Sequence, residues 1–385
     1  MATVTNGDKV SGDKEPGGNE PAAKKPVEVV LTKERLLGKE SRWRRFGEPV
    51  PAGGSLNEDG TPDYGLFGPG SVVWEVLLHP ATIVFHNSVQ AFMQTKYKPI
   101  HAGIRDRDPI VRKGRAGTLT FFDSFERLQR NAGMHAPMWL GDTATAKLMA
   151  KHLHNIHKRV AGDVIDVGEP ELGGYAASEP RDAMWAALTE MHPMLRVYEA
   201  FAFRGGKLPR RLPAETRDQF MLESSAYVRL HGVPVDDEIP TTMAELAALY
   251  EKYDELFGDT ETMNISPDAG DDYQKMMAKV MIENFHISQV RAIGPLMIQA
   301  VLFQLPTSGL LSRKVRQSIG QSALKQKIAV LSSKLVLPIV FLMQQPPIER
   351  YFMRLMWGPD GVHLIESARA LHKQALADRS AATAA

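Results

Sequence analysis

Helical periodicity is the feature of this sequence that most restricts its fold. Apolar residues recur at helical spacing over nine long stretches, whereas short Val/Ile runs such as VEVVL are not followed by a series of alternating segments. We therefore predict an all-α protein with a single globular helical domain. The expected helices span residues 70–92, 142–160, 181–203, 214–230, 242–256, 271–285, 288–304, 312–337 and 363–376.

Composition narrows the class of protein further. Hydrophobic residues make up 43% of the 385-residue chain and charged residues 24%, as in soluble globular proteins. The net charge of +1 provides no overall field that would favour nucleic acid. The chain has no cysteine, which excludes disulfides, thiolate metal sites and cysteine nucleophiles. The lack of cysteine suits a reducing compartment, and we expect a cytoplasmic protein.

Four segments are expected along the chain. Residues 1–28 are rich in Gly, Pro, Lys and Glu without an apolar core, which predicts a disordered tail and no secretory signal. An extended lead-in follows over residues 29–64, then one helical domain over 65–345, then a C-terminal helical extension and tail over 346–385.

The most apolar stretch, IAVLSSKLVLPIVFLM (328–343), is interrupted by Lys334 and Pro338. It is shorter than the roughly 20 residues that cross a bilayer. We predict a buried helix pair there, with peripheral contact to a membrane surface as the alternative.

Three of the 12 histidines lie together in KHLHNIHKRVAG (151–162). Asp142 is the expected N-cap of their helix, and Gly162 is the expected stop just beyond it. Met149, Leu153, Ile156 and Val160 form the expected apolar stripe.

The helical wheel separates the three histidines. At about 100° per residue, His157 lies on one flank of the stripe, His152 on the other, and His154 towards solvent, so the three cannot converge on one ion. Two interpretations remain. One is a histidine at the edge of the core with two surface neighbours. The other is a single axial ligand to haem iron, for which one neutral imidazole suffices.

Four segments in order resemble the rubber-oxygenase catalytic domain, a family that includes latex-clearing proteins and the membrane-bound oxygenase of mycophenolic acid biosynthesis. FGPGSVVWEVLLHP resembles its GPGS-x-x-W helix, and RLQRNAGMHAPMWLGDTATAKLMAKHLHNIHKRVAG (127–162) resembles its R-x-x-[RK]-T, G-D-x-x-x-A and I-H-x-x-V-x-G block. YAASEPRDAMWAAL resembles its Y-x-A-x-D-P-x-x-x-x-W-V-H-A block, and RLHGVPVDDEIPTTMAEL resembles its L-G-V-P … P-x-T-x-x-E-L segment.

The resemblance covers roughly residues 65–345 and implies an all-α fold with one b-type haem held between core helices. It places the axial ligand to the iron at His157, the histidine that the wheel puts on the inward flank. It places the oxygen-side residues at Arg127, Arg130 and Asn131, which would act as the catalytic hydrogen-bond donors.

The chain departs from the family pattern at several positions. Arg130 and Asn131 stand where the pattern has lysine and threonine, and Arg130 keeps the charge but not the chemistry of an amine. The pattern's W-V-H histidine is alanine here (Ala187), and Lys98 replaces an early histidine. We expect residues 104–126 to form a rearranged loop, with Lys98 and His101 at an exposed edge or, alternatively, near the site.

Two further histidines are candidates for a pocket. His192 precedes Pro193 inside a helix and is expected to be a packed histidine at a kink, and His286 is expected in a satisfied core position. No dinucleotide-binding, P-loop or hydrolase motif appears in the required context.

The sequence therefore predicts a haem b-dependent oxygenase that acts with dioxygen on an apolar, isoprenoid or lipid-like small molecule. Contact with a membrane surface is possible, and no nucleic acid is expected as a partner. The alternative is a non-catalytic haem- or lipid-binding protein on the same scaffold.

Overall fold

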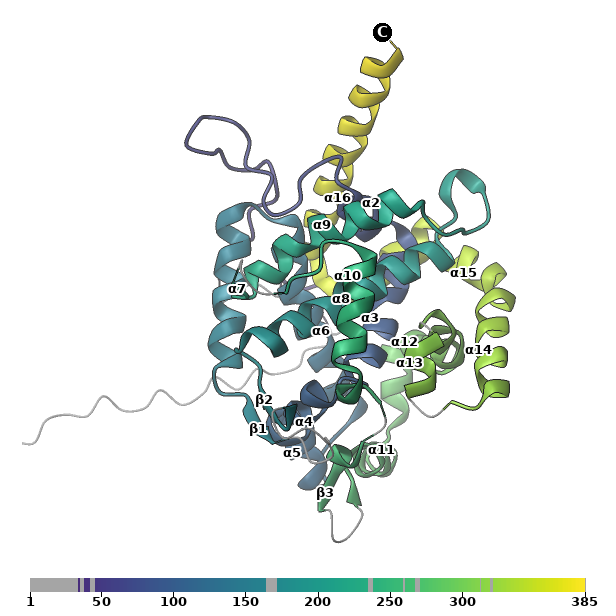
Figure 1. Cartoon of the computed structure of the whole chain (residues 1–385). Helices are drawn as coiled ribbons and strands as arrows, with labels where there is room; N and C mark the ends of the chain where they lie inside the picture. The colour runs from purple at the N-terminus through teal and green to yellow at the C-terminus, as the bar shows by residue number, and fades with distance from the viewer. Residues whose placement is uncertain are drawn as a thin grey trace, which may run out of the picture. The chain divides into compact units, whose positions relative to one another are not determined.

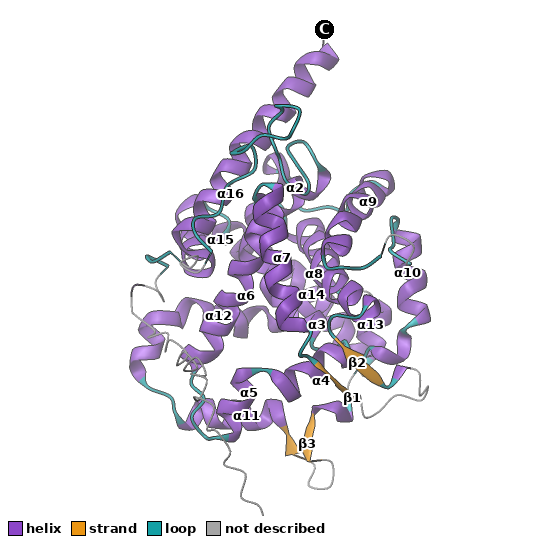
Figure 2. Cartoon of the chain, turned by 90° about the vertical axis from the view of Figure 1, so that its left-hand side faces the viewer, coloured by secondary structure: helices purple, strands orange, loops and turns teal. Residues whose placement is uncertain are grey.

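The computed structural model is mostly helical (Figures 1 and 2). It describes residues 34, 38–41, 46–163, 172–234, 238–258, 260–266, 271–311, 313–318 and 321–384. The expected tail over residues 1–28 lies outside the described residues. Over the described ranges the all-α class is confirmed.

Proline starts helices in the first part of the chain. The single helix expected over 70–92 is two helices, α2 (Val72–Leu77) and α3 (Pro80–Gln94). Pro80 is the first residue of α3, and Nδ1 of His79 caps it by accepting the amide of Ala81 at 3.1 Å. A proline in the first helical turn sacrifices no hydrogen bond, because that N–H has no partner within the helix.

Residues 104–126 form helices, so the expectation of a rearranged loop is wrong. The segment holds the end of α4 (Lys98–Arg107), all of α5 (Pro109–Arg115) and the start of α6 (Phe121–Leu140). Pro99 and Pro109 sit in first turns, and Thr120 and Asp123 form a capping box at α6. Residues that suggest a loop here serve as helix starts.

The histidine helix is α7 (Thr143–His157), which packs against α6 as a helical hairpin. Oδ1 of Asp142 accepts the amide of Thr145 at 2.8 Å, which confirms the expected N-cap. The expected stop at Gly162 is wrong, because α7 ends at His157 and Gly162 lies in strand β1. Glycine at this position leaves room for Tyr175, because a Cβ would lie 2.7 Å from its hydroxyl and displace the ring.

The core surrounds α8 (Pro180–Phe201), which is buried along almost its whole length. Helices α3 and α9 (Ala214–Leu230) pack against it (Figure 1). Helix α10 (Met243–Lys252) follows, with short 3-10 turns at Arg204–Gly206, Asp254–Leu256 and Glu261–Met263. The strands form two antiparallel pairs, β1 (Ala161–Asp163) with β2 (Gly174–Ala176) and β3 (Asn264–Ser266) with β4 (Asp271–Asp272).

The last third of the chain is again helical. It contains α11 (Tyr273–Glu283), α12 (Ile287–Leu310), α13 (Arg313–Ser318), α14 (Ala323–Leu335), α15 (Leu337–Met343) and α16 (Pro346–Ala384). Helix α16 packs against α6 and α3, and its final turns extend beyond the other elements (Figure 1). A non-helical residue, Gly358 with φ of 68°, breaks α16 just before Pro359.

The expectation of a buried helix pair over 328–343 is wrong. Helices α14 and α15 expose most of their large apolar side chains, and only Ala329 and Val340 are buried. In the described part of the chain, no single helix has the length and hydropathy of a membrane span. Only the pair of α14 and α15, taken together, has the length and hydropathy of a span, and the two helices are bent by 47° relative to each other.

Candidate functional site

His157 lies in the last turn of α7 and is half-buried. Burial lowers the pKa of its imidazole to about 4, with smaller contributions from the positive charges that His135 and His154 can carry. The ring is therefore neutral near pH 7. Among the described residues no hydrogen bond to this ring is found, so its nitrogens are free to meet another group.

The other two histidines of the cluster point elsewhere. The ring of His152 packs edge-on against Phe46 with centroids 4.8 Å apart, and His154 is half-buried beside Gly232. The inward face of α7 also differs from the expected stripe. Ile156 is exposed, and the buried positions are Thr145, Ala146, Met149, Ala150 and Leu153, because this face packs against α6.

A buried carboxylate joins four helices next to this helix pair. Oε1 of Glu190 in α8 accepts the amide of Gln90 in α3 at 2.9 Å and lies 3.0 Å from Nδ1 of His135 in α6. Oε2 of Glu190 accepts the hydroxyl of Tyr227 in α9 at 2.7 Å. We call Gln90, His135, Glu190 and Tyr227 the Glu190 cluster.

The Glu190 cluster holds an ionised carboxylate in the protein interior. Burial alone would raise the pKa of Glu190, but His135 and the hydrogen bonds from His135 and Tyr227 outweigh it and lower the pKa. A carboxylate beside Nδ1 keeps the proton on that nitrogen of His135 and fixes the orientation of the ring. The stacked ring of Trp139, 5.5 Å away at 14°, supports the same orientation.

His231 is a further buried nitrogen of this region. It caps the end of α9, and its ring meets that of Tyr227 edge-on at 4.6 Å. Although the residue is only half-buried overall, its Nε2 is shut off from solvent and has no hydrogen-bond partner among the described residues. Burial lowers the pKa of His231 to about 3, with smaller effects from Glu190, His135 and His157. His135, His157 and His231, from three helices, therefore lie within electrostatic reach of one another.

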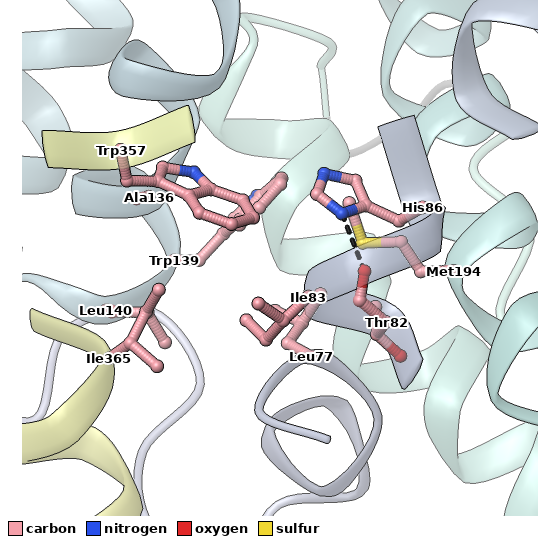
Figure 3. Close-up of a pocket in the computed structure, with 10 residues that line it drawn as sticks. All are labelled: Leu77, Thr82, Ile83, His86, Ala136, Trp139, Leu140, Met194, Trp357 and Ile365. Carbon is pink, nitrogen blue, oxygen red and sulfur yellow. Dashed lines mark hydrogen bonds between the residues drawn. The ribbon is translucent and has the colours of Figure 1, made fainter. Parts of the chain in front are cut away.

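Aromatic rings frame a small cavity beside the Glu190 cluster (Figure 3). It is lined by His86, Trp139, Met194, Trp357 and six other residues, and its volume is about 10 Å³, room for one water molecule. His86 stacks on Trp357 at 5.6 Å, and its Nδ1 donates to the carbonyl of Thr82 at 2.8 Å. Burial lowers the pKa of His86 to about 4.

The expected oxygen-side residues all lie on α6. Nε of Arg127 pairs with Oδ2 of Asp108 at 2.9 Å. Arg130 is exposed, and Asn131 is half-buried. Within the described ranges, no hydrogen bond or ion pair joins any of the three to His157, although α6 and α7 pack against each other.

Other candidate residues lie in unexpected places. His101 is buried on α4 with its Nε2 3.0 Å from the amide of Gln274, so the exposed-edge interpretation is wrong for it. Lys98 is half-buried at the start of the same helix. His286 is exposed, so the expected core position is wrong. The residue lies just before the start of α12, at the surface of the protein. His192 is a packed histidine next to Pro193, 3.2 Å from the hydroxyl of Tyr250.

The segment YAASEPRDAMWAAL (175–188), which resembles one of the family's sequence blocks, has a structural role. Tyr175 in β2 donates to Asp106 at 2.7 Å, and Asp182 accepts the amide of Ala176 at 2.8 Å and the hydroxyl of Tyr97 at 2.8 Å. Trp185 packs among Tyr97 and other aromatic rings. These residues tie β2 and α4 to the start of α8.

Sequence reasoning missed the Glu190 cluster, although one signal was present. Glu190 is the only Asp, Glu, Lys or Arg between Asp182 and Arg196, in a largely apolar stretch. A lone charge on a buried helix requires partners. Those partners come from α3, α6 and α9, and no local pattern identifies them.

Haem b, the group that the resemblance implies, needs a neutral nitrogen donor and an apolar enclosure. Two nitrogen donors fit, because His157 is desolvated and neutral, and Nε2 of His231 is buried without a partner in the part of the chain that the structure describes. The cavity of Figure 3, at about 10 Å³, is too small for a macrocycle, so the helices would have to part to admit one.

Comparison with known proteins assigns the fold to a family. The family model described as "ER-bound oxygenase mpaB/B'/Rubber oxygenase, catalytic domain" matches residues 74–330, two thirds of the chain. No curated protein and no solved structure matches the chain. The matched region contains α7, α8 and α9 and with them His157, Glu190 and His231. The chain therefore belongs to the mpaB and rubber-oxygenase catalytic-domain family.

Proposed function

We propose that this chain is a haem b-dependent oxygenase that acts with dioxygen on an apolar small molecule, such as an isoprenoid or another lipid. Membership of an oxygenase family supports the class of reaction. The observation that carries the haem assignment is His157, a desolvated imidazole with a pKa near 4 and no hydrogen bond to its ring among the described residues. The mainly apolar and aromatic lining of the cavity in Figure 3 supports an apolar substrate.

The chain's own residues would divide the work. When bound, haem would supply the iron that binds and activates dioxygen. His157 would hold the iron through its neutral nitrogen. Glu190 would keep a proton on Nδ1 of His135 within electrostatic reach of His157. Arg127, Arg130 and Asn131 are the proposed hydrogen-bond donors on the oxygen side, and Arg127 would have to leave Asp108 to take that role.

The second candidate is a non-catalytic haem- or lipid-binding protein. Two observations favour this candidate. Arg127 pairs with Asp108, and Arg130 is exposed to solvent, so neither side chain is engaged as an oxygen-side hydrogen-bond donor. For either function we propose a cytoplasmic location, which suits a chain without cysteine.

Absorption spectroscopy of the full chain tests the proposal. Titration with haemin is expected to give a Soret band that saturates at one haem per chain. The band should be lost or much weakened in His157→Ala and retained in His152→Ala, a matched change one and a half turns earlier on the same helix.

Two outcomes would contradict parts of the proposal. A wild-type protein that is folded by circular dichroism and gives no Soret band with haemin would rule out both haem functions. A haem-loaded protein that consumes no oxygen with prenyl-chain substrates would leave the non-catalytic candidate.

A further inference from the structure

Helix α14 carries an apolar stripe that faces outwards. Leu324, Ile328, Leu331 and Leu335 are 69%, 46%, 56% and 69% exposed. Their spacing of i, i+4, i+7 and i+11 places them within a narrow sector of the helix. On the opposite side Ala329 is fully buried and approaches Gly309 of α12. A helix of a globular protein normally buries such a stripe against the core. The exposure of this stripe therefore indicates that it contacts something other than the core of this protein.

Lysines border the stripe on both sides. Lys325 lies about 90° from its centre in one direction, and Lys327 and Lys334 lie about 70–90° away in the other. All three lysines are exposed. This arrangement lets lysine side chains reach polar headgroups while the stripe enters the apolar boundary beneath them.

Neighbouring helices extend the apolar surface. Helix α15 exposes Ile339, Phe341 and Leu342, and helix α12, which packs against α14, exposes a stripe of its own. In Figure 1, α14 lies at the edge of the molecule beyond α12 and α13. The exposed residues of the α12 stripe are Ile298, Val301, Leu302 and Leu305.

This region of the chain is positively charged, whereas the rest of the chain is negatively charged. Residues 284–348 contain seven basic residues and no acidic one. Because the whole chain carries +1, the remaining residues carry −6. An exposed apolar surface inside a segment of charge +7 is complementary to an anionic lipid surface. It is not complementary to a second copy of itself, because two such segments repel each other.

We propose that the outer face of α14 and α15 docks on an anionic lipid bilayer surface. The apolar stripe enters the boundary between headgroups and acyl chains, and Lys325, Lys327 and Lys334 pair with lipid phosphates and carboxylates. The bend of 47° at Val336 and the lysine within the pair suit a helix pair lying in the interface rather than crossing it. The proposal does not depend on haem binding.

Sedimentation of the full-length protein with vesicles tests the proposal. Vesicles of phosphatidylcholine alone are compared with vesicles that also contain phosphatidylserine. The protein is expected to sediment with the anionic vesicles only, and to be released in about 1 M salt, where the Debye length falls to about 3 Å.

Substitutions at exposed positions identify the surface. Lys325→Gln with Lys327→Gln and Lys334→Gln is expected to weaken binding on the order of a hundredfold, since each lysine near an anionic surface contributes about 1 kcal/mol. Leu331→Ser with Leu335→Ser is expected to abolish it. One matched control is a triple Lys→Gln variant of exposed Lys147 and Lys151 on α7 and of Lys158, its C-cap. The other is Leu208→Ser at another exposed leucine, and both should bind as wild type.

Several results would overturn the proposal. They are failure of the wild type to bind either kind of vesicle, equal binding to neutral vesicles, and wild-type binding by the α14 lysine variant. Association that resists alkaline carbonate would show insertion instead of docking. A dimer in solution that dissociates in the leucine variant would show that a second copy covers this face.

Discussion

At the scale of single residues, Glu190 is a side chain on which three buried polar groups depend. Its two oxygens receive the amide of Gln90, the hydroxyl of Tyr227 and Nδ1 of His135. Each of these groups is buried, so none can turn to water instead. The loss of one carboxylate would therefore leave three groups unsatisfied.

Glu190→Ala is expected to lower the free energy of unfolding by about 3–5 kcal/mol, the usual cost of breaking a buried charged pair. Glu190→Gln should cost less, because the amide keeps one acceptor for Tyr227 or Gln90. Urea denaturation at pH 7 measures both. Glu58→Ala, at an exposed loop position, is the control and should change stability by less than about 0.5 kcal/mol. A Glu190→Ala protein as stable as wild type would show that the cluster contributes nothing to folding.

Buried neutral histidines make the fold sensitive to acid. Burial lowers the pKa of His86 and His157 to about 4 and of His192 and His231 to about 3. An unfolded histidine has a pKa near 6.5, so below that pH the unfolded chain binds protons that the folded chain does not. Stability is expected to fall from pH 6.5 to about pH 4, by up to about 1.4 kcal/mol per pH unit for each fully enclosed histidine.

His231→Leu tests this dependence and introduces the residue that the family's L-G-V-P pattern has at this position. Stability at pH 7 should be unchanged or higher, because the change replaces a buried nitrogen that has no partner among the described residues with an apolar group. The decline in denaturation midpoint between pH 7 and pH 4.5 should be shallower than in wild type. Arg229→Gln, an exposed change two residues earlier, should leave the slope unaltered. An equally steep decline in His231→Leu would assign the acid sensitivity to other groups.

At the scale of elements, local patterns located whole helices and individual caps better than they located every helix end. Helix α9 spans the expected residues 214–230, and Asp142 caps α7 as expected. Helices α4, α5 and the start of α6 were missed because their prolines and charges suggest a loop, whereas Pro99 and Pro109 occupy first turns and Thr120 caps α6. The α14 stripe was predicted to be buried, since periodicity locates an apolar face without showing what it contacts.

The candidate site likewise contains one part that the sequence predicted and one part that it did not. His157 follows from its position on one helix, and its burial agrees with the expected inward flank. The Glu190 cluster depends on the packing of four helices, which no spacing within one of them encodes.

The contact between α12 and α14 depends on a glycine. A Cβ at Gly309 would lie 2.2 Å from the carbonyl oxygen of Ala329, a backbone atom that cannot turn aside. Gly309→Ala is therefore expected to separate the two helices and cost about 1–3 kcal/mol. Gly294→Ala is the matched control in α12, where the nearest atom is at 3.5 Å, and should stabilise by about 0.5–1 kcal/mol. Thermal unfolding of both variants is the measurement, and destabilisation of equal size would refute the close-contact explanation.

At the scale of the whole molecule, the matched region is smaller than the unit that folds. The amide of Asp142 bonds to the carbonyl of Val50, and Asp63 accepts both the amide and the hydroxyl of Thr143. These contacts hold the start of α7 from outside residues 74–330. Helix α16, also outside, adds Trp357 to the buried core.

A fragment limited to residues 74–330 is therefore expected not to fold. Removal of α16 exposes the surfaces that Phe352, Trp357 and Leu364 cover, and deletion of even one large core side chain costs about 3–5 kcal/mol. The total stability of a domain is only about 5–15 kcal/mol. A fragment of residues 46–385 keeps both sets of contacts and should unfold cooperatively. Circular dichroism melting curves compare the two, and a cooperative transition in the shorter fragment would contradict the expectation.

The arrangement of tryptophans has a practical consequence. Four of the five, Trp74, Trp139, Trp185 and Trp357, are buried, and Trp139 and Trp357 stack on His135 and His86. The emission of indole rings overlaps the near-ultraviolet side of a porphyrin's absorption, so a bound porphyrin accepts their excitation energy. The protein's own fluorescence therefore reports, without any label, whether a pigment has entered among these helices, because energy transfer over so short a path would extinguish the emission.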